Sequence, residues 1–126
     1  MEPGRLRRED CLLVADDSAD GVVGLVLGRA CENEPGYAGE IRVLHISPAH
    51  QRQGIGRQLV CAVVDHFAQH AIDSMVVHVL KANPNRPFYE RLGGQFVREE
   101  PYDWNGVILP DVIYGWRNIA PITTRR

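Results

Sequence analysis

A strand, a glycine-containing loop, an amphipathic helix and a second apolar strand follow one another in the middle of the chain. The run from Ile41 to Ile46 predicts a buried strand over 40–46, and Ser47-Pro48 ends it. Apolar residues at helical spacing predict a helix over 56–70. The almost continuously apolar segment 74–80 predicts a central strand covered on both faces. Because a strand–helix–strand crossover is right-handed and parallel, this order predicts a sheet with a central parallel pair.

The segments on either side predict antiparallel hairpins. The dipeptide Asn105-Gly106 between two apolar runs is the strongest short hairpin signal in the chain. We therefore expect one α/β (α+β) domain over 1–126, with its core at about 12–116, a mostly antiparallel mixed sheet and helices packed on it. The flanking elements expected are strands over 12–15 and 22–28, a short helix from Pro84 to Leu92, and strands over 95–99 and 107–116.

Composition and charge limit the classes of protein to which this chain can belong. The net charge of −2 gives no electrostatic reason to expect nucleic acid or an anionic membrane as a partner. No apolar segment approaches the roughly 18 residues that a membrane span needs, and the first ten residues do not resemble a signal peptide. The cysteines have no metal-binding spacing and favour reduced, buried thiols in a cytoplasmic protein. They are Cys11, Cys31 and Cys61.

The loop over 51–56 predicts an anion site. Its Gly-x-Gly stands at the start of a helix, where several backbone N–H groups and the helix dipole favour a phosphate or pyrophosphate. The loop is no Walker motif, because no Gly-Lys-Ser/Thr follows it. It is no dinucleotide fingerprint either, because Leu59 stands where the third glycine would be.

Two motifs of the chain carry a resemblance to a known family. The first is the loop Gln51-Arg-Gln-Gly-Ile-Gly56, and the second is Asn83-Pro-Asn-Arg-Pro-Phe-Tyr-Glu-Arg-Leu-Gly-Gly94. The loop matches the pattern Arg/Gln-x-x-Gly-x-Gly/Ala of the GCN5-related N-acetyltransferase superfamily, and the second motif resembles the later helix of the same superfamily. They occur in the family's order, separated by a helix and an apolar strand. Family members usually begin with a further strand and two helices, so the resemblance is to a short form: a minimal version, a truncated start, or a chain that a partner completes.

The resemblance implies the GNAT-like fold and acetyl-CoA as co-substrate, with no metal. The backbone of the loop would hold the pyrophosphate, the strand before it would bind the pantetheine arm, and the later motif would contact the arm from the opposite side. The cofactor-binding residues so implied are Leu44, His45, Ile46, Arg52, Gln53, Gly54, Ile55, Gly56, Arg57, Asn83 and Phe88.

Tyr89 is the candidate general acid. Acyl transfer from a thioester expels a thiolate, which a nearby phenol can protonate. The alternative is that Tyr89 is a packing aromatic at the end of a helix. The motif around Tyr89 favours the catalytic interpretation.

Glu40 is the candidate general base. A carboxylate at the start of the cofactor-binding strand could accept the proton of an amine acceptor through water. Strand alternation predicts that Glu40 lies on the same face as Ile46. The alternative is a solvated charge at a strand end, and the weaker substitutes for the base are Asp103, Tyr102 and His78.

Other polar and aromatic residues have simpler interpretations. His66 and His70 lie one helical turn apart, so a metal pair is conceivable, but the sequence indicates no third ligand. Trp104 and Trp116 are expected to pack, and Trp104 could instead line an acceptor pocket. The basic end at Arg125 is expected to be a solvated tail.

The sequence therefore predicts an N-acetyltransferase that transfers acetyl from acetyl-CoA to a primary amine by direct attack in a ternary complex. The acceptor would be a small molecule or a peptide, and a homodimer could complete its site. The alternatives are a non-catalytic acyl-CoA-binding module and, less favoured, a nucleotide-binding domain of another kind.

Overall fold

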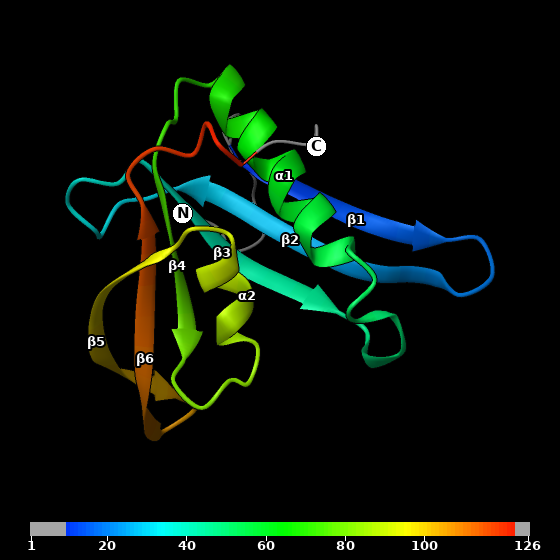
Figure 1. Ribbon diagram of the computed structural model, residues 1–126. Coiled ribbons are helices and arrows are strands. Elements are labelled where there is room, and N and C mark those ends of the chain that lie inside the picture. The colour runs from blue at the N-terminus through cyan, green and yellow to red at the C-terminus, as the bar shows by residue number, and fades with distance from the viewer. Residues whose placement is uncertain (1–9, 123–126) are drawn as a thin grey trace.

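The computed structural model describes residues 10–122, apart from the side chain of Trp104. Strands and helices follow each other there in the expected order, and the expectations for the first nine residues and for the tail at Arg125 lie outside this part (Figure 1). No helix of the described part is long and apolar enough to cross a membrane. The elements are β1 (Cys11–Asp17), β2 (Gly21–Ala30), β3 (Gly39–Ile46), the 3-10 helix η1 (Pro48–His50), α1 (Ile55–Gln69), β4 (Met75–Leu80), α2 (Arg86–Arg91), β5 (Gln95–Trp104) and β6 (Val107–Trp116).

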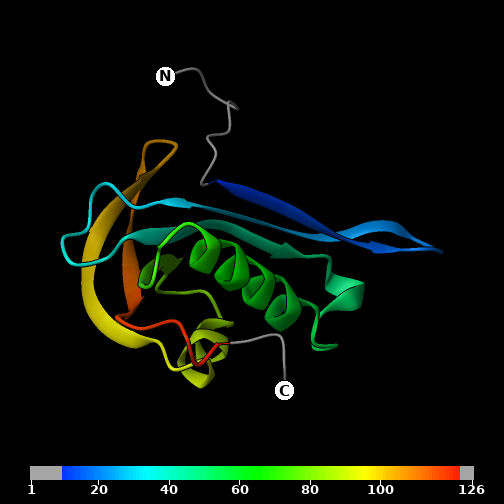
Figure 2. The same cartoon turned by 90° about the horizontal axis from the view of Figure 1, so that it is seen from above.

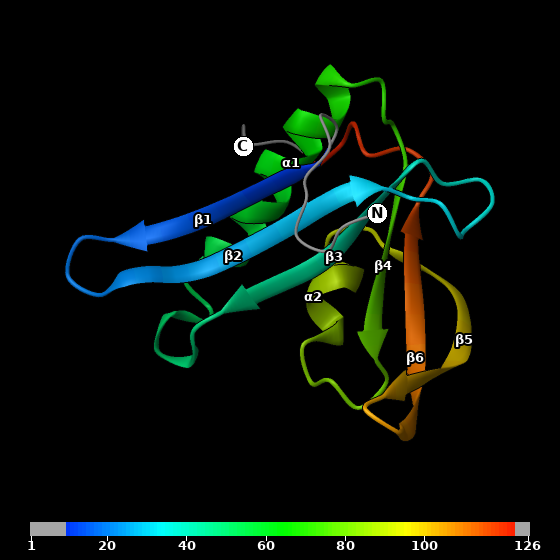
Figure 3. The ribbon, with the colours of Figure 1, turned by 180° about the vertical axis from the view of Figure 1, so that it is seen from behind.

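Within residues 10–122, six strands form one sheet in the order β1-β2-β3-β4-β6-β5. Of these described strands, only β3 and β4 pair in parallel, and the other neighbours are antiparallel. This confirms the predicted mixed sheet with a central crossover. Figure 2 shows α1 and α2 on the same side of the sheet, and Figure 3 views β1, β2 and β3 from the face opposite α1.

Helix α1 packs closely against β2 and β3. Its predicted apolar stripe is confirmed, and Val63 and Phe67 are fully buried. A Cβ added at Gly28 would lie only 2.7 Å from Val63, and one at Gly39 would lie 2.8 Å from Phe67. The missing side chains of these glycines let the helix approach the sheet closely.

Several elements are longer than their sequence patterns. The β5 strand, expected over 95–99, continues to Trp104 because its pairing with β6 extends to the Asn105-Gly106 turn, where Trp104 faces Val107. The expectation of an Asn-Gly hairpin is therefore confirmed, and Asn105 has a φ of +52°.

The β3 strand contains a bulge that changes one site prediction. The register of β3 against β2 shifts so that no residue of β2 pairs with Arg42. Because of this extra residue, the side chains after Arg42 point to the opposite faces from those that regular alternation would give. Ile41 is buried in the helix-side core, and Leu44 and Ile46 pack against that same core. Glu40 therefore lies on the opposite face, and the prediction that it shares a face with Ile46 is wrong because it assumed unbroken alternation.

The parallel strands diverge soon after they meet. Their pairing is confined to Gly39 with Met75, Glu40 with Val76 and Ile41 with Val77. Beyond these pairs β3 and β4 point in different directions (Figure 1). The second half of β3 thus has backbone groups on its β4 side that β4 does not use.

Candidate active site

A cleft of about 750 Å³ lies among the end of β3, the loop before α1, and α2. Most residues predicted to bind the cofactor, together with the predicted acid, line this one cleft. Segments distant in sequence meet there. For example, the ring of Phe88 on α2 lies 3.4 Å from the point that a Cβ added to Gly56 on α1 would occupy. The predicted residues in the lining are Leu44, His45, Ile46, Arg52, Gly54, Gly56, Arg57, Asn83, Phe88 and Tyr89.

Three predicted residues do not line the cleft. The amide of Gln53 donates a hydrogen bond to the carbonyl oxygen of Ala49 at 3.4 Å, and Ile55 packs against the hydrophobic core. Glu40 lies on the other face of the sheet, as described above. The side chains of Gln53 and Ile55 are thus structural, while their backbone N–H groups remain part of the loop.

The cleft also contains residues that were not predicted from the sequence. Most of them belong to the two motifs or flank them, so proximity could have found them. Arg91 had a clear signal, because it lies three residues after Phe88 on the same helix face. The missed lining residues are His50, Gln51, Pro84, Asn85, Pro87, Arg91 and Leu92.

The loop before α1 presents N–H groups that the helix does not use. The first helical bond runs from the N–H of Gln58 to the carbonyl oxygen of Gly54, so the N–H groups of Ile55, Gly56 and Arg57 precede it. Gly54 is the N-cap with a φ of +86°, and no side chain caps the helix. Such left-handed residues at a helix start form a concave nest of N–H groups that suits an anion.

Three arginines add positive charge to this cleft. Arg52, Arg57 and Arg91 line it, and each is exposed. Among the residues that the structure describes, none of the three forms an ion pair with a carboxylate. The charges therefore remain available to phosphate groups, which arginine binds well.

The walls of the cleft differ in chemistry. One wall is the edge of β3 that β4 leaves unpaired, with Leu44 and Ile46, and the ring of Phe88 forms another part of the lining. On this edge the side-chain amide of Gln51 donates a hydrogen bond to the carbonyl oxygen of Ile46 at 3.1 Å. The carboxamide oxygen of Asn83 accepts a hydrogen bond from the N–H of Asn85 at 2.8 Å, so it also holds the turn before α2. A narrow ligand could pair with the strand edge as an added strand does.

Tyr89 is the most deeply buried of the predicted site residues in the cleft. Its side chain is 8% exposed, and its ring contacts Phe88 edge-on at 5.1 Å and stacks with Tyr114 at 6.2 Å. Burial raises the pKa of Tyr89 to about 12. The phenol therefore keeps its proton at neutral pH and can donate it.

The face of the sheet away from α1 and α2 carries a separate set of polar side chains around Glu40 and His78. Glu40 is buried there and accepts a hydrogen bond from Arg42 at 3.1 Å. His78 Nδ1 lies 3.1 Å from the carboxylate of Asp111, and burial raises the pKa of Asp111. Strand pairing places His78 and Asp111 on the same face as Glu40, since Glu40 pairs with Val76, two residues before His78.

The other substitutes for the base lie away from the cleft. Tyr102 is exposed on β5. The carboxylate of Asp103 accepts a hydrogen bond from the N–H of Gly106 at 2.8 Å and so closes the β5–β6 turn. Asp103 therefore has a structural role that its sequence position next to Asn105-Gly106 could have indicated.

Two histidine–carboxylate groups in the described part were not evident from the sequence. In each, the potential ligand atoms lie within 4.8 Å of one another, although the residues come from separate segments. The rings of His66 and His70, the pair suggested by spacing, lie 4.4 Å apart between centroids with their planes tilted by 33°. The groups that could hold a metal ion are Asp17, Asp20 and His50, and His78, Glu100 and Asp111.

The remaining aromatic and cysteine residues are mostly structural. Trp116 is buried and its indole N–H donates to the carbonyl oxygen of Leu92 at 2.9 Å, which confirms its packing role. The side chain of Trp104 lies outside the described part. Cys11 and Cys61 are buried as expected, whereas Cys31 is only half-buried.

This sheet, with a central parallel pair that diverges beside an N–H-rich helix start, is the GNAT acyl-CoA N-acyltransferase fold. The family model described as the Acetyltransferase (GNAT) family matches residues 2–94. The chain belongs to this family.

Individual relatives agree with this assignment. The N-acetyltransferase YuaI of Bacillus subtilis, itself uncharacterized, is 32% identical over 114 residues, which are 90% of this chain and 66% of YuaI. The structure of yncA from Salmonella typhimurium with its cofactor acetyl-CoA has a TM-score of 0.63 at 20% identity, over 79% of this chain and 60% of yncA. An aminoglycoside 6'-N-acetyltransferase complexed with coenzyme A has a TM-score of 0.70 at 19% identity, over 90% and 74% of the two chains. The chain thus spans slightly less than two thirds of the length of YuaI.

Proposed function

We propose that the protein binds acetyl-CoA in this cleft and transfers its acetyl group to a primary amine of a small-molecule or peptide acceptor. One observation carries the proposal: the N–H nest, the free edge of β3 and the buried phenol of Tyr89 all meet in one cleft. The relatives solved with acetyl-CoA and with coenzyme A share the fold and support the choice of cofactor.

The cleft suits the three parts of the cofactor. The diphosphate would lie against the N–H groups of Ile55, Gly56 and Arg57, where the three arginines add charge. The pantetheine arm would pair with the edge of β3 that β4 leaves unpaired, near Leu44 and the N–H of Ile46, and would compete with the Gln51 amide for the carbonyl oxygen of Ile46. That arrangement directs the thioester toward the point where β3 and β4 diverge.

The reaction would proceed by direct attack. The amine nitrogen adds to the thioester carbonyl carbon, backbone N–H groups near Ile46 stabilise the oxyanion, and the carbon–sulfur bond then breaks. Tyr89 gives its proton to the departing thiolate. The proton of the resulting ammonium group passes through water to a base. The products are an amide and coenzyme A. Because the amine attacks the thioester directly, no acyl-enzyme forms.

The acid and the base would act from opposite faces of the sheet. Tyr89 lies on the helix side, whereas the bulge at Arg42 places Glu40 on the other face. An acceptor that approaches from the Glu40 face would meet the carbonyl on the side away from Tyr89. This separation keeps the phenol from protonating the attacking amine.

Calorimetric titration with acetyl-CoA tests the cofactor. We expect saturable binding of acetyl-CoA and none of ATP, because the arm as well as the diphosphate contributes contacts. Equal binding of ATP, or no binding of acetyl-CoA, would contradict the proposal. Binding without acetylation of any member of a panel of amines would favour a non-catalytic acyl-CoA-binding module.

The pH dependence of turnover tests Glu40. The acidic limb of the profile of kcat/KM reports the base of the free enzyme. Glu40→Gln should lower kcat/KM about 100-fold at neutral pH and flatten that limb. His78→Asn is the matched variant on the same face and should leave the limb in place. If His78→Asn removes the limb and Glu40→Gln preserves it, His78 with Asp111 is the base instead.

A further inference from the structure

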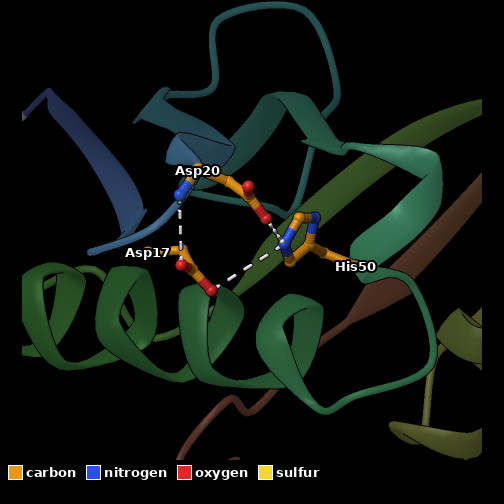
Figure 4. Close-up of side chains that lie close together, drawn as sticks. All are labelled: Asp17, Asp20 and His50. Carbon is orange, nitrogen blue, oxygen red and sulfur yellow. Dashed lines mark hydrogen bonds and ion pairs between the residues drawn. The ribbon is translucent and has the colours of Figure 1, made fainter.

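We propose that Asp20 and His50 form a positioning relay that holds the diphosphate-binding loop of the acetyl-CoA site from the tip of the β1–β2 hairpin. The inference rests on the proposed function for its ligand. It concerns residues that neither motif contains and that come together only in the folded chain (Figure 4).

Hydrogen bonds connect the hairpin tip to the loop through the ring of His50. The Nε2 atom lies 3.0 Å from Asp20 Oδ2, and Nδ1 lies 2.8 Å from the hydroxyl oxygen of Ser47. Asp17 Oδ2 is 3.8 Å from the same Nε2. Both nitrogens of the ring are thus engaged, one on each side, which fixes its orientation.

The hairpin end of this relay is itself braced. The carboxylate of Asp17 accepts hydrogen bonds from the N–H groups of Ala19 at 2.7 Å and Asp20 at 3.2 Å. These backbone hydrogen bonds lower the pKa of Asp17, so its carboxylate stays ionised. The turn therefore presents the side chain of Asp20 toward His50 in a defined position, as Figure 4 shows.

The loop end of the relay leads directly to the N–H groups. His50 ends η1 and lines the cleft, and only a few residues separate it from Gly54. The N–H of Ser47 donates to the carbonyl oxygen of Val23 on β2 at 2.8 Å, so the same loop is tied to the hairpin twice. Because Arg52, which is not a glycine, has a φ of +66°, the loop between η1 and α1 depends on such outside supports.

The relay has a measurable consequence for the cofactor. A nest of N–H groups binds an anion well only when it is held in the bound geometry beforehand. Breaking one charge-assisted hydrogen bond that supports the nest should weaken acetyl-CoA binding about tenfold. S-acetylpantetheine, which lacks the diphosphate, should bind with unchanged affinity.

The test compares Asp20→Ala with Asp16→Ala by NMR titration in EDTA. Both variants remove one exposed carboxylate from the same hairpin, but Asp16 takes no part in the relay. Asp20→Ala should move the amide signals of Ile55, Gly56 and Arg57 in the free protein and raise the dissociation constant of acetyl-CoA. Asp16→Ala should do neither.

Two further variants separate positioning from a general loss of structure. Asp20→Asn keeps an oxygen acceptor for His50 and should restore most of the affinity for acetyl-CoA. A double variant of Asp20→Ala with His50→Ala should bind no more weakly than His50→Ala alone, since the two residues act through one contact.

Unchanged loop signals and unchanged acetyl-CoA affinity in Asp20→Ala would overturn the relay. So would an equal loss of affinity for acetyl-CoA and S-acetylpantetheine. If the wild-type protein does not bind acetyl-CoA, the proposed function fails, while the loop signals of the free variants still decide whether Asp20 positions the loop.

Discussion

Gly54→Val should reduce the affinity for acetyl-CoA at least 100-fold and leave no binding that calorimetry detects. Gly54 has a φ of +86°, a conformation that a β-branched residue strongly disfavours. A Cβ at this position would meet nothing within 4 Å, so the substitution creates no internal clash. The effect would come from a changed backbone, which withdraws the N–H groups of the nest, and from a side chain placed where the diphosphate must approach.

Gly106→Val is a matched control for this substitution. Gly106 has a φ of +88°, and its Cβ position is equally open, but it lies in the β5–β6 turn. Both variants should lose stability by roughly 1–2 kcal/mol, measured by thermal or urea unfolding. Only Gly54→Val should lose acetyl-CoA binding. If Gly54→Val still bound acetyl-CoA, the loop would not be part of the cofactor site.

Tyr89→Phe should lower kcat by about 100-fold and leave the affinity for acetyl-CoA nearly unchanged, as expected for loss of a general acid. Phenylalanine preserves the contacts of the ring with Phe88 and Tyr114, so packing should change little. Tyr37→Phe is the control, because Tyr37 packs over Gly115 and Arg117 away from the cleft. Unaffected turnover in Tyr89→Phe would make Tyr89 a packing residue.

The ionisation of Tyr89 gives this experiment a second readout. Burial raises its pKa to about 12 from the ordinary value of 10.0, so absorbance titration should show a phenol that ionises late and that Tyr89→Phe lacks. The folded state holds this proton more tightly than the unfolded state does. The corresponding stability is complete below pH 10 and is lost as the pH rises through 12, so the alkaline loss of stability should be smaller in Tyr89→Phe.

Periodicity predicted most of the fold because it depends on local spacing. The stripe of α1, the apolar run of β4 and the Asn105-Gly106 turn each occupy a continuous segment, and each appears where it was expected. The strand ends were less accurate. The length of β5 depends on pairing with β6, which is a property of two segments together.

The site was predictable where it follows a continuous motif. The loop from Arg52 to Arg57 and the helix with Phe88 and Tyr89 were predicted from sequence, and all of their predicted site residues except Gln53 and Ile55 line one cleft. The face of Glu40 was not found, because the bulge at Arg42 is a matter of register against β2. A single extra residue in β3 placed the candidate catalytic carboxylate of Glu40 on the face of the sheet opposite to Ile46, instead of on the same face as predicted.

By itself, the sequence determined the order of elements, the loop predicted to bind an anion and the tyrosine predicted to act as the acid, because each depends on residues close together in the chain. Only the tertiary structure decided which face Glu40 occupies, how high the pKa of Tyr89 rises, and that Asp20 reaches His50. Those properties depend on strand register, burial and contacts between distant segments, and none of these leaves a periodic signal in the chain.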